Sequence, residues 1–235
     1  ALAINPDDIE ALLNKGNAMN KLSNYKEAEK CYKRYLKLMP DNASVMASLS
    51  MAIISQDELR HEEAMAYLVN GEEVARRTGD DDALCEVLQD KAFLLSMLGT
   101  DVDHAISLVD EAMKLSLQHL SNEYFVLKGY IYLQNGEVRK AQTEFYNAIK
   151  ESDFSEETAL RIAVSYYDNA YVHLAYLMLK HVLKIYGKHV SVDIYAYMAM
   201  FCRECGKDDE YEMYRSLAYE MDAKEATRIF STFSV

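Results

Sequence analysis

The stretch Leu12-Leu13-Asn14-Lys15-Gly16, near the start of the chain, has a counterpart in Phe125-Val126-Leu127-Lys128-Gly129. Each stretch begins with an apolar pair and ends in Lys-Gly. A methionine or tyrosine stands three positions after each glycine, and an alanine stands twelve positions after it. These two parts of the chain are therefore predicted to form the same structural unit.

The same spacing recurs along nearly the whole chain, which indicates a repeat architecture. Gly129 and Ala163 are 34 residues apart, and so are Ala141 and Ala175. Each unit has a small residue where two helices would cross, because only a small side chain lets the helix axes approach closely. These crossing residues are Gly16, Ser50, Ala92, Gly129, Ala163 and Ala199.

This pattern resembles the tetratricopeptide repeat, a helix-turn-helix unit of about 34 residues. Six units can be placed, at residues 9–42, 43–78, 85–121, 122–155, 156–191 and 192–225. The resemblance implies an all-α fold, a right-handed superhelical solenoid whose end is covered by a capping helix at about residues 223–233. Residues 1–6 match the end of a preceding unit. We therefore expect residues 1–235 to form a single solenoid domain of a longer protein.

The chain departs from the family's pattern in three respects. The aromatic residue expected near the start of each unit is replaced by a varied set, namely Leu12, Met46, Leu88, Phe125, Ala159 and Tyr195. In the sixth unit, Tyr211 stands where the second helix should have a small residue. The second and third units are 42 residues apart, so we expect a longer turn near residues 58–62 and a longer loop over 77–82. The acidic triplet Asp80–Asp82 is expected to cap the following helix.

The composition favours helices and limits the classes of function. Two prolines and eight glycines are too few for the many turns of an all-β fold. The net charge of -13 argues against nucleic-acid binding, which needs clustered lysines and arginines, and against an anionic membrane surface. Residues 43–121 contain 15 acids and 5 bases. This excess suggests either a partner of basic character near these residues or an acidic face that aids solubility.

No motif predicts catalysis, a metal site or a cofactor. Cys202-Arg203-Glu204-Cys205 has the spacing of a zinc or redox pair, but no second pair of ligands stands at a suitable distance. Cys202 also falls at a core position of the repeat, so we expect a structural role for it. No two of the six histidines are four apart, as a metal pair on one helix face would require. We therefore expect a protein that is not an enzyme.

The resemblance also indicates where a partner would bind. In this family the first helices of the units line the concave side of the solenoid, and ligands lie there. Helical periodicity places on that side the residues one after, three before, and four or five after each crossing residue. The candidate peptide-binding residues are Leu13, Asn17, Met51, Phe93, Val126, Tyr130, Leu133, Leu160, Val164, Tyr167, Met200 and Arg203. The apolar middle of this set favours an apolar or amphipathic peptide laid in a groove, and the alternative is close packing in which these side chains bury one another or a neighbouring copy.

Some members of the family hold the C-terminal carboxylate of chaperones with a clamp of lysine, asparagine and arginine. Asn17 matches the asparagine, but Leu13 stands where the lysine should be. The clamp positions of the next two units are occupied by Ser48, Gln89 and Phe93. The sequence therefore does not predict a chaperone carboxylate as the partner.

The predicted function is that of a protein–protein interaction scaffold or adaptor. One alternative is a structural solenoid that forms a homo-oligomer through the same groove or through its end repeats. Another is the recognition part of a larger enzyme or membrane-linked protein. No stretch reaches the roughly 18 apolar residues of a membrane span. Four cysteines without a disulfide framework favour a reducing, cytoplasmic location, and the start inside a repeat suggests that N-terminal sequence is missing.

Overall fold

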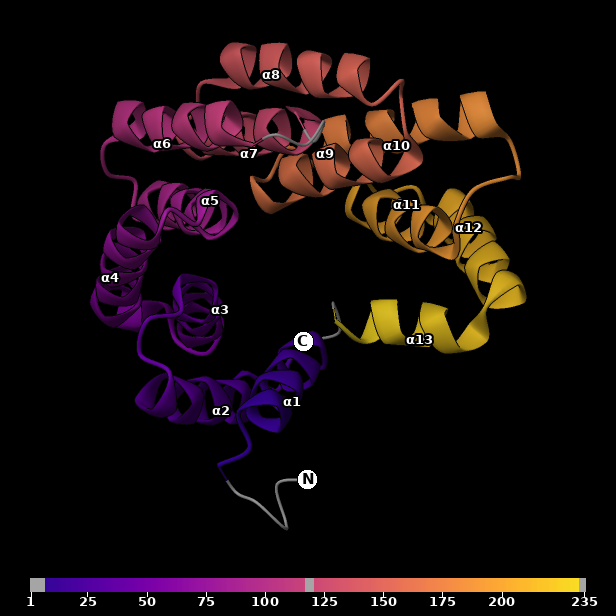
Figure 1. Ribbon diagram of the computed structural model, residues 1–235. Coiled ribbons are helices and arrows are strands. Elements are labelled where there is room, and N and C mark those ends of the chain that lie inside the picture. Colours follow the sequence, from indigo (N-terminus) through magenta and orange to yellow (C-terminus); the bar gives the residue numbers. More distant parts are fainter. Residues whose placement is uncertain (1–6, 117–120, 233–235) are drawn as a thin grey trace. The chain divides into compact units, whose positions relative to one another are not determined.

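The computed structural model describes residues 7–116 and 121–232 (Figure 1). These residues form thirteen α-helices and one 3₁₀ turn, and no strand occurs among them. The chain divides into two compact units, unit 1 over residues 1–120 and unit 2 over residues 121–235, and each is described by itself. The prediction of an all-α fold built from helix-turn-helix repeats is confirmed.

Unit 1 contains three helical hairpins. The hairpins are α1 (Ile9–Lys21) with α2 (Tyr25–Leu38), α3 (Ala43–Ile54) with α4 (His61–Thr78), and α5 (Asp81–Met97) with α6 (Val102–Leu115). Within this unit α2 also contacts α3, α4 contacts α5, and α3 packs on α5. Fully buried side chains such as Leu49, Leu68 and Leu88 fill the space between these helices. The predicted end of a preceding repeat at residues 1–6 lies outside the described residues.

Unit 2 contains three more hairpins and a final helix. The hairpins are α7 (Ser121–Gln134) with α8 (Val138–Glu151), α9 (Glu156–Asp168) with α10 (Val172–Tyr186), and α11 (Val192–Glu204) with α12 (Asp208–Met221). Helix α13 (Ala223–Ser231) packs on α11 and α12 and buries Ala226 and Ile229 there. The Asp222 carboxylate caps α13 by accepting hydrogen bonds from the backbone N–H groups of Lys224 and Glu225, each at 3.0 Å.

Five of the six hairpins share one turn. The residue seven positions after the crossing residue has a positive φ in each: Ser23 (56°), Gly99 (60°), Gly136 (74°), Ala170 (64°) and Gly206 (67°). The N–H of the next residue then donates to a carbonyl five residues earlier, as Glu137 does to Tyr132 at 2.8 Å. This left-handed cap satisfies a carbonyl at the end of the first helix. The hairpins therefore share a backbone conformation at the turn as well as a spacing of side chains.

The second hairpin departs from this pattern, and its extra residues are arranged differently from the prediction. Glu58–Arg60 form a 3₁₀ turn, η1, directly before α4. The predicted longer loop over residues 77–82 was wrong, because α4 continues to Thr78 and α5 begins at Asp81. Gly79, with a φ of 69°, ends α4, so most of the additional residues lengthen the helices. Capping by the acidic triplet is confirmed, since the Asp80 side chain accepts from the Ala83 N–H at 3.0 Å.

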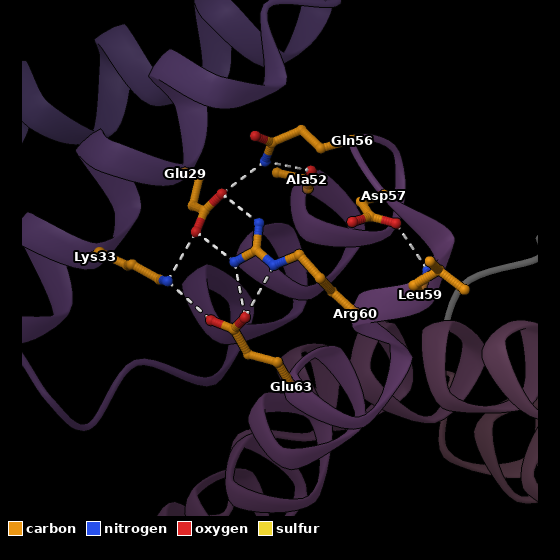
Figure 2. Close-up of polar contacts among 8 residues, drawn as sticks. All are labelled: Glu29, Lys33, Ala52, Gln56, Asp57, Leu59, Arg60 and Glu63. Carbon is orange, nitrogen blue, oxygen red and sulfur yellow. Dashed lines mark hydrogen bonds and ion pairs between the residues drawn. The ribbon is translucent and has the colours of Figure 1, made fainter.

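A group of charged side chains joins the first two hairpins of unit 1 (Figure 2). The carboxylate of Glu29 on α2 accepts two hydrogen bonds from the Arg60 guanidinium, at 2.8 and 3.0 Å, and one from Gln56 at 2.7 Å. Lys33 lies within 2.8 Å of both Glu29 and Glu63. Hydrogen bonds from Arg60 lower the pKa of Glu29 to about 2. This network stabilises the junction of α2 with η1 and α4.

Candidate peptide-binding faces

The predicted binding residues of unit 1 lie on its three first helices. The side chains of Leu13 on α1, Met51 on α3 and Phe93 on α5 are partly exposed, and Asn17 is exposed. The Asn17 amide oxygen accepts a hydrogen bond from the Tyr32 hydroxyl at 2.9 Å. Burial raises the pKa of Tyr32, so this hydroxyl stays protonated and able to donate. Asn17 therefore stabilises the first hairpin through its amide oxygen. The side chain that bears the amide N–H₂ group is itself exposed.

A polar pocket of about 370 Å³ lies within unit 1 and brings together two of these predicted residues. Leu13 and Asn17 form part of its wall. The rest comes from helices α3, α4 and α5 and from the junctions that precede α3 and α5, and it includes the carboxylates of Asp41, Asp80 and Glu86. Sequence periodicity did not find the pocket, because these last residues belong to helix ends and to the junctions between repeats. Its walls offer hydrogen-bonding groups and carboxylates.

One carboxyl group of α5, that of Asp90, has a raised pKa. Asp90 of α5 is partly buried, and this burial together with nearby Glu86 raises the pKa of Asp90 to about 7. Low-dielectric surroundings disfavour the charged form of a carboxyl group, and a like charge adds to the effect. Near neutral pH the Asp90 side chain is therefore protonated in a substantial fraction of the molecules.

The corresponding face of unit 2 is formed by α7 and α9, which pack against each other. Tyr130 on α7 and Leu160, Val164 and Tyr167 on α9 are all partly exposed. The three α9 residues follow the spacing of a single helix face. The Tyr130 hydroxyl accepts a hydrogen bond from the Gln134 amide at 2.9 Å. These four side chains form an apolar and aromatic surface, which we call the α7–α9 face.

The α7–α9 face continues toward α11 through an aromatic contact. The ring centroids of Tyr167 and Phe201 are 5.1 Å apart. Burial, with a smaller effect of the Glu204 carboxylate, raises the pKa of Tyr167, so its hydroxyl is neutral at physiological pH. Burial also raises the pKa of the neighbouring Asp168. Arg203, the predicted polar residue at this end, is exposed on the last turn of α11.

Three residues that we expected to line the groove are buried instead. Val126 and Leu133 on α7 are 6% and 3% exposed, and Met200 on α11 is 3% exposed. All three belong to the hydrophobic core of unit 2. Helix α7 packs on both α8 and α9, and α11 packs on α10, α12 and α13. Neighbouring helices therefore cover more than one side of α7 and of α11. Their side chains are not available to a partner on this surface.

The cysteine pair fits the structural role expected from the sequence. Cys202 is fully buried in the core, and burial raises the pKa of its thiol to about 12. A thiol with so high a pKa is a poor nucleophile at neutral pH.

Within residues 7–116 and 121–232, no group of three or more His, Cys, Asp or Glu side chains is arranged to hold a metal ion. None of the helices described by the structure is both long enough and apolar enough to cross a membrane.

Comparison with solved structures identifies tetratricopeptide-containing proteins of similar fold. Pseudomonas aeruginosa PilF matches with a TM-score of 0.56 and 16% identity, over 96% of this chain and 97% of that chain. The human IFIT1 dimer with m7Gppp-AAAA matches with a TM-score of 0.61 and 17% identity, over 94% of this chain and 53% of that one. A chain of the APC/C hetero-tetramer Cut9-Hcn1 matches with a TM-score of 0.56 and 13% identity, over 94% and 41% respectively.

This likeness supports a tetratricopeptide-like repeat fold. The present chain spans about half of the matched IFIT1 chain and less than half of the Cut9-Hcn1 chain. No family model matches the sequence. No curated protein matches it either. Because a shared fold hosts many functions, these likenesses establish the architecture and not a partner.

Proposed function

We propose that this chain is a protein-interaction scaffold that binds an apolar or amphipathic peptide segment on its first-helix faces. The α7–α9 face is the observation that carries the proposal. Tyr130, Leu160, Val164 and Tyr167 leave apolar and aromatic surface accessible on two adjoining helices. A contiguous apolar patch on a soluble surface marks an interaction site. Tyrosine suits such a face because its ring is apolar and its hydroxyl can hydrogen-bond to a partner.

Unit 1 offers a separate polar surface. The pocket beside Leu13 and Asn17 has carboxylates in its wall, so it suits a basic side chain of a bound segment. Each unit is thus proposed to bind by itself, unit 2 through apolar contacts and unit 1 through a polar contact with a basic side chain. The net charge of -13 favours a protein partner over a nucleic acid, whose phosphates would be repelled. Binding without turnover is the expected activity.

The test compares capture of partners by the purified chain and by a Tyr130→Glu/Val164→Glu double variant. Both side chains are partly exposed, so circular dichroism should show that the variant keeps its helices. A photo-crosslinking amino acid at position 164 should attach to the captured protein. The same group at Leu22, which is 72% exposed and lies outside the proposed face, should not. Equal capture by both chains, or crosslinking only at position 22, would contradict the proposal.

A further inference from the structure

A second apolar surface lies on the second helices of unit 2, away from the first-helix face. Helices α8 and α10 border a pocket of about 380 Å³ that opens to solvent. Figure 1 shows that α8 and α10 are the outer partners of α7 and α9 within this unit. We call this surface the α8–α10 groove. Its apolar lining includes Phe145, Tyr146 and Ile149 on α8 and Leu174, Leu177 and Met178 on α10.

Two of these side chains are unusually exposed for their type. Tyr146 is 68% exposed and Leu177 is 45% exposed. The second helix of a repeat normally presents polar residues to solvent on the side that faces away from its hairpin. Here both helices instead direct apolar residues into one shared depression, which has the features of a binding groove for an apolar segment.

The charges on α10 indicate what kind of segment would fit. Residues 169–192 contain three lysines and no acidic residue. Lys184 stands seven positions after Leu177, so it lies on the same stripe of α10, two turns further on. Lys184 is exposed, and among the described residues it forms no ion pair. Lys188 follows shortly after the end of α10, and α8 carries Arg139, Lys140 and Lys150 beside the acidic Glu144 and Glu151, so basic side chains are present on both helices that border the groove.

We propose that the α8–α10 groove binds an amphipathic segment of a partner protein, with its apolar residues in the groove and acidic residues along α10 near Lys184. The apolar lining provides the burial that drives association. Lys184 provides a specific polar contact, because its exposed ammonium group attracts a carboxylate of the bound segment. This site is independent of the one on the first helices, so the chain would hold two different segments.

The test uses two synthetic fluorescein-labelled peptides. Each has about 14 residues, which form on the order of four helical turns. One has leucines at every third or fourth position and glutamates elsewhere, and the other has lysines in place of the glutamates. Fluorescence anisotropy measures their binding to the whole chain. We expect binding of the glutamate peptide that depends on the groove, whereas any binding of the lysine peptide, which suits the acidic pocket of unit 1, should not depend on the groove.

Variants assign the binding to the groove. Leu177→Glu should weaken binding of the glutamate peptide about tenfold. Met213→Glu on α12 should leave it unchanged, since Met213 has a similar exposure, 47% against 45%, but does not line the groove. Lys184→Glu should weaken it about threefold, an effect that added salt reduces, and Lys26→Glu on α2 should have no effect. Circular dichroism checks that each variant is folded.

Three results would overturn the inference. The first is no binding of the glutamate peptide to the unaltered chain. The second is an equal loss of glutamate-peptide binding in the Met213→Glu and Leu177→Glu variants. The third concerns a second copy of the chain as the occupant. If sedimentation shows a concentration-dependent dimer that Leu177→Glu abolishes, the groove is a self-association surface and the partner segment is excluded.

Discussion

The ring of Phe145 packs directly on Gly129, so that a Cβ atom placed on residue 129 would lie 2.2 Å from Phe145 Cε1. This contact is the crossing point of α7 and α8. Phe145 is 2% exposed, and its ring meets that of Tyr166 edge-on at a centroid distance of 5.0 Å. The ring therefore lies between Gly129 of α7 and Tyr166 of α9. Tyr32 packs on Gly16 in the same way at the first hairpin, with the corresponding distance at 2.6 Å.

The Gly129 contact predicts that Gly129→Ala destabilises the chain. An alanine normally stabilises a helix interior by about 1 kcal/mol relative to glycine. Here overpacking against Phe145 should outweigh that gain, for a net loss of about 1–2 kcal/mol in urea unfolding followed by circular dichroism, and Gly129→Leu should cost about 3 kcal/mol. The Gly129→Ala/Phe145→Leu double variant is the control, because the smaller side chain makes room for the methyl group. Additive losses in this pair would show that the two residues do not interact.

The shared turn predicts opposite effects for two substitutions at equivalent positions. Ala170 has a φ of 64°, where a side chain is strained, so Ala170→Gly should stabilise unit 2 by about 0.5 kcal/mol after the entropy of glycine is subtracted. Gly206 has a φ of 67°, and a Cβ there would meet no atom within 4 Å. Gly206→Ala should therefore destabilise through the backbone alone, by about 1 kcal/mol. Thermal melting measures the stability of both variants. If both substitutions shifted the melting temperature in the same direction, the prediction would be wrong.

The Glu29 network predicts a stability that depends on pH. The pKa of Glu29 is lowered from 4.5 to about 2, so the folded state favours the ionised carboxylate. The stabilisation is complete above the unfolded pKa and is lost as the pH falls from about 4.5 toward 2. Glu29→Gln should cost about 1–2 kcal/mol at pH 7, and the difference should vanish near pH 2.

The control for this pH dependence is Glu27→Gln. Glu27 is on the same helix and pairs with Lys30 on the protein surface, where ion pairs contribute little. Urea unfolding at pH 7 should therefore separate the two variants clearly. If Glu29→Gln lowered the free energy of unfolding equally at pH 7 and pH 2, the charged network would not be the source of the stabilisation.

The cysteines are predicted to differ in reactivity. Cys202 is fully buried, and burial raises the pKa of its thiol to about 12. Cys205 is partly exposed, and burial raises the pKa of its thiol as well. Cys31 and Cys85 are buried as well. Alkylation of the native chain at pH 8, mapped by mass spectrometry, should modify Cys205 first and the other three only when urea is added. Rapid labelling of Cys202 in the native chain would show that the end of α11 opens.

Much of the fold could be predicted from the sequence, because it depends on local spacing. The crossing residues, from Gly16 to Ala199, recur at intervals that only a chain of helical hairpins explains. Helix ends were predictable where a side chain caps them, as Asp80 does for α5. The extra residues of the second hairpin were assigned to a loop because spacing alone does not distinguish a longer loop from a longer helix. Gly79 decides between them through its left-handed backbone conformation.

The candidate site was predicted only in part, for a different physical reason. Helical periodicity states which residues share a face, and Tyr130 and Val164, two of the residues placed on the binding face, are partly exposed. Exposure also depends on how many neighbouring helices cover that face. Val126 and Leu133 have the same sequence pattern as their neighbours but are buried where α8 and α9 close around α7.

The sequence by itself thus determined the repeats, the helices and the stripe of each helix that packs in its own hairpin. These follow from the size and spacing of side chains within about 34 residues. Only the tertiary structure decided which apolar residues stay accessible, as Tyr146 and Leu177 do, and which carboxylate meets which base, as Glu29 meets Arg60. Both depend on contacts between residues about 30 positions apart, whose distances are fixed by the packing of one hairpin on the next.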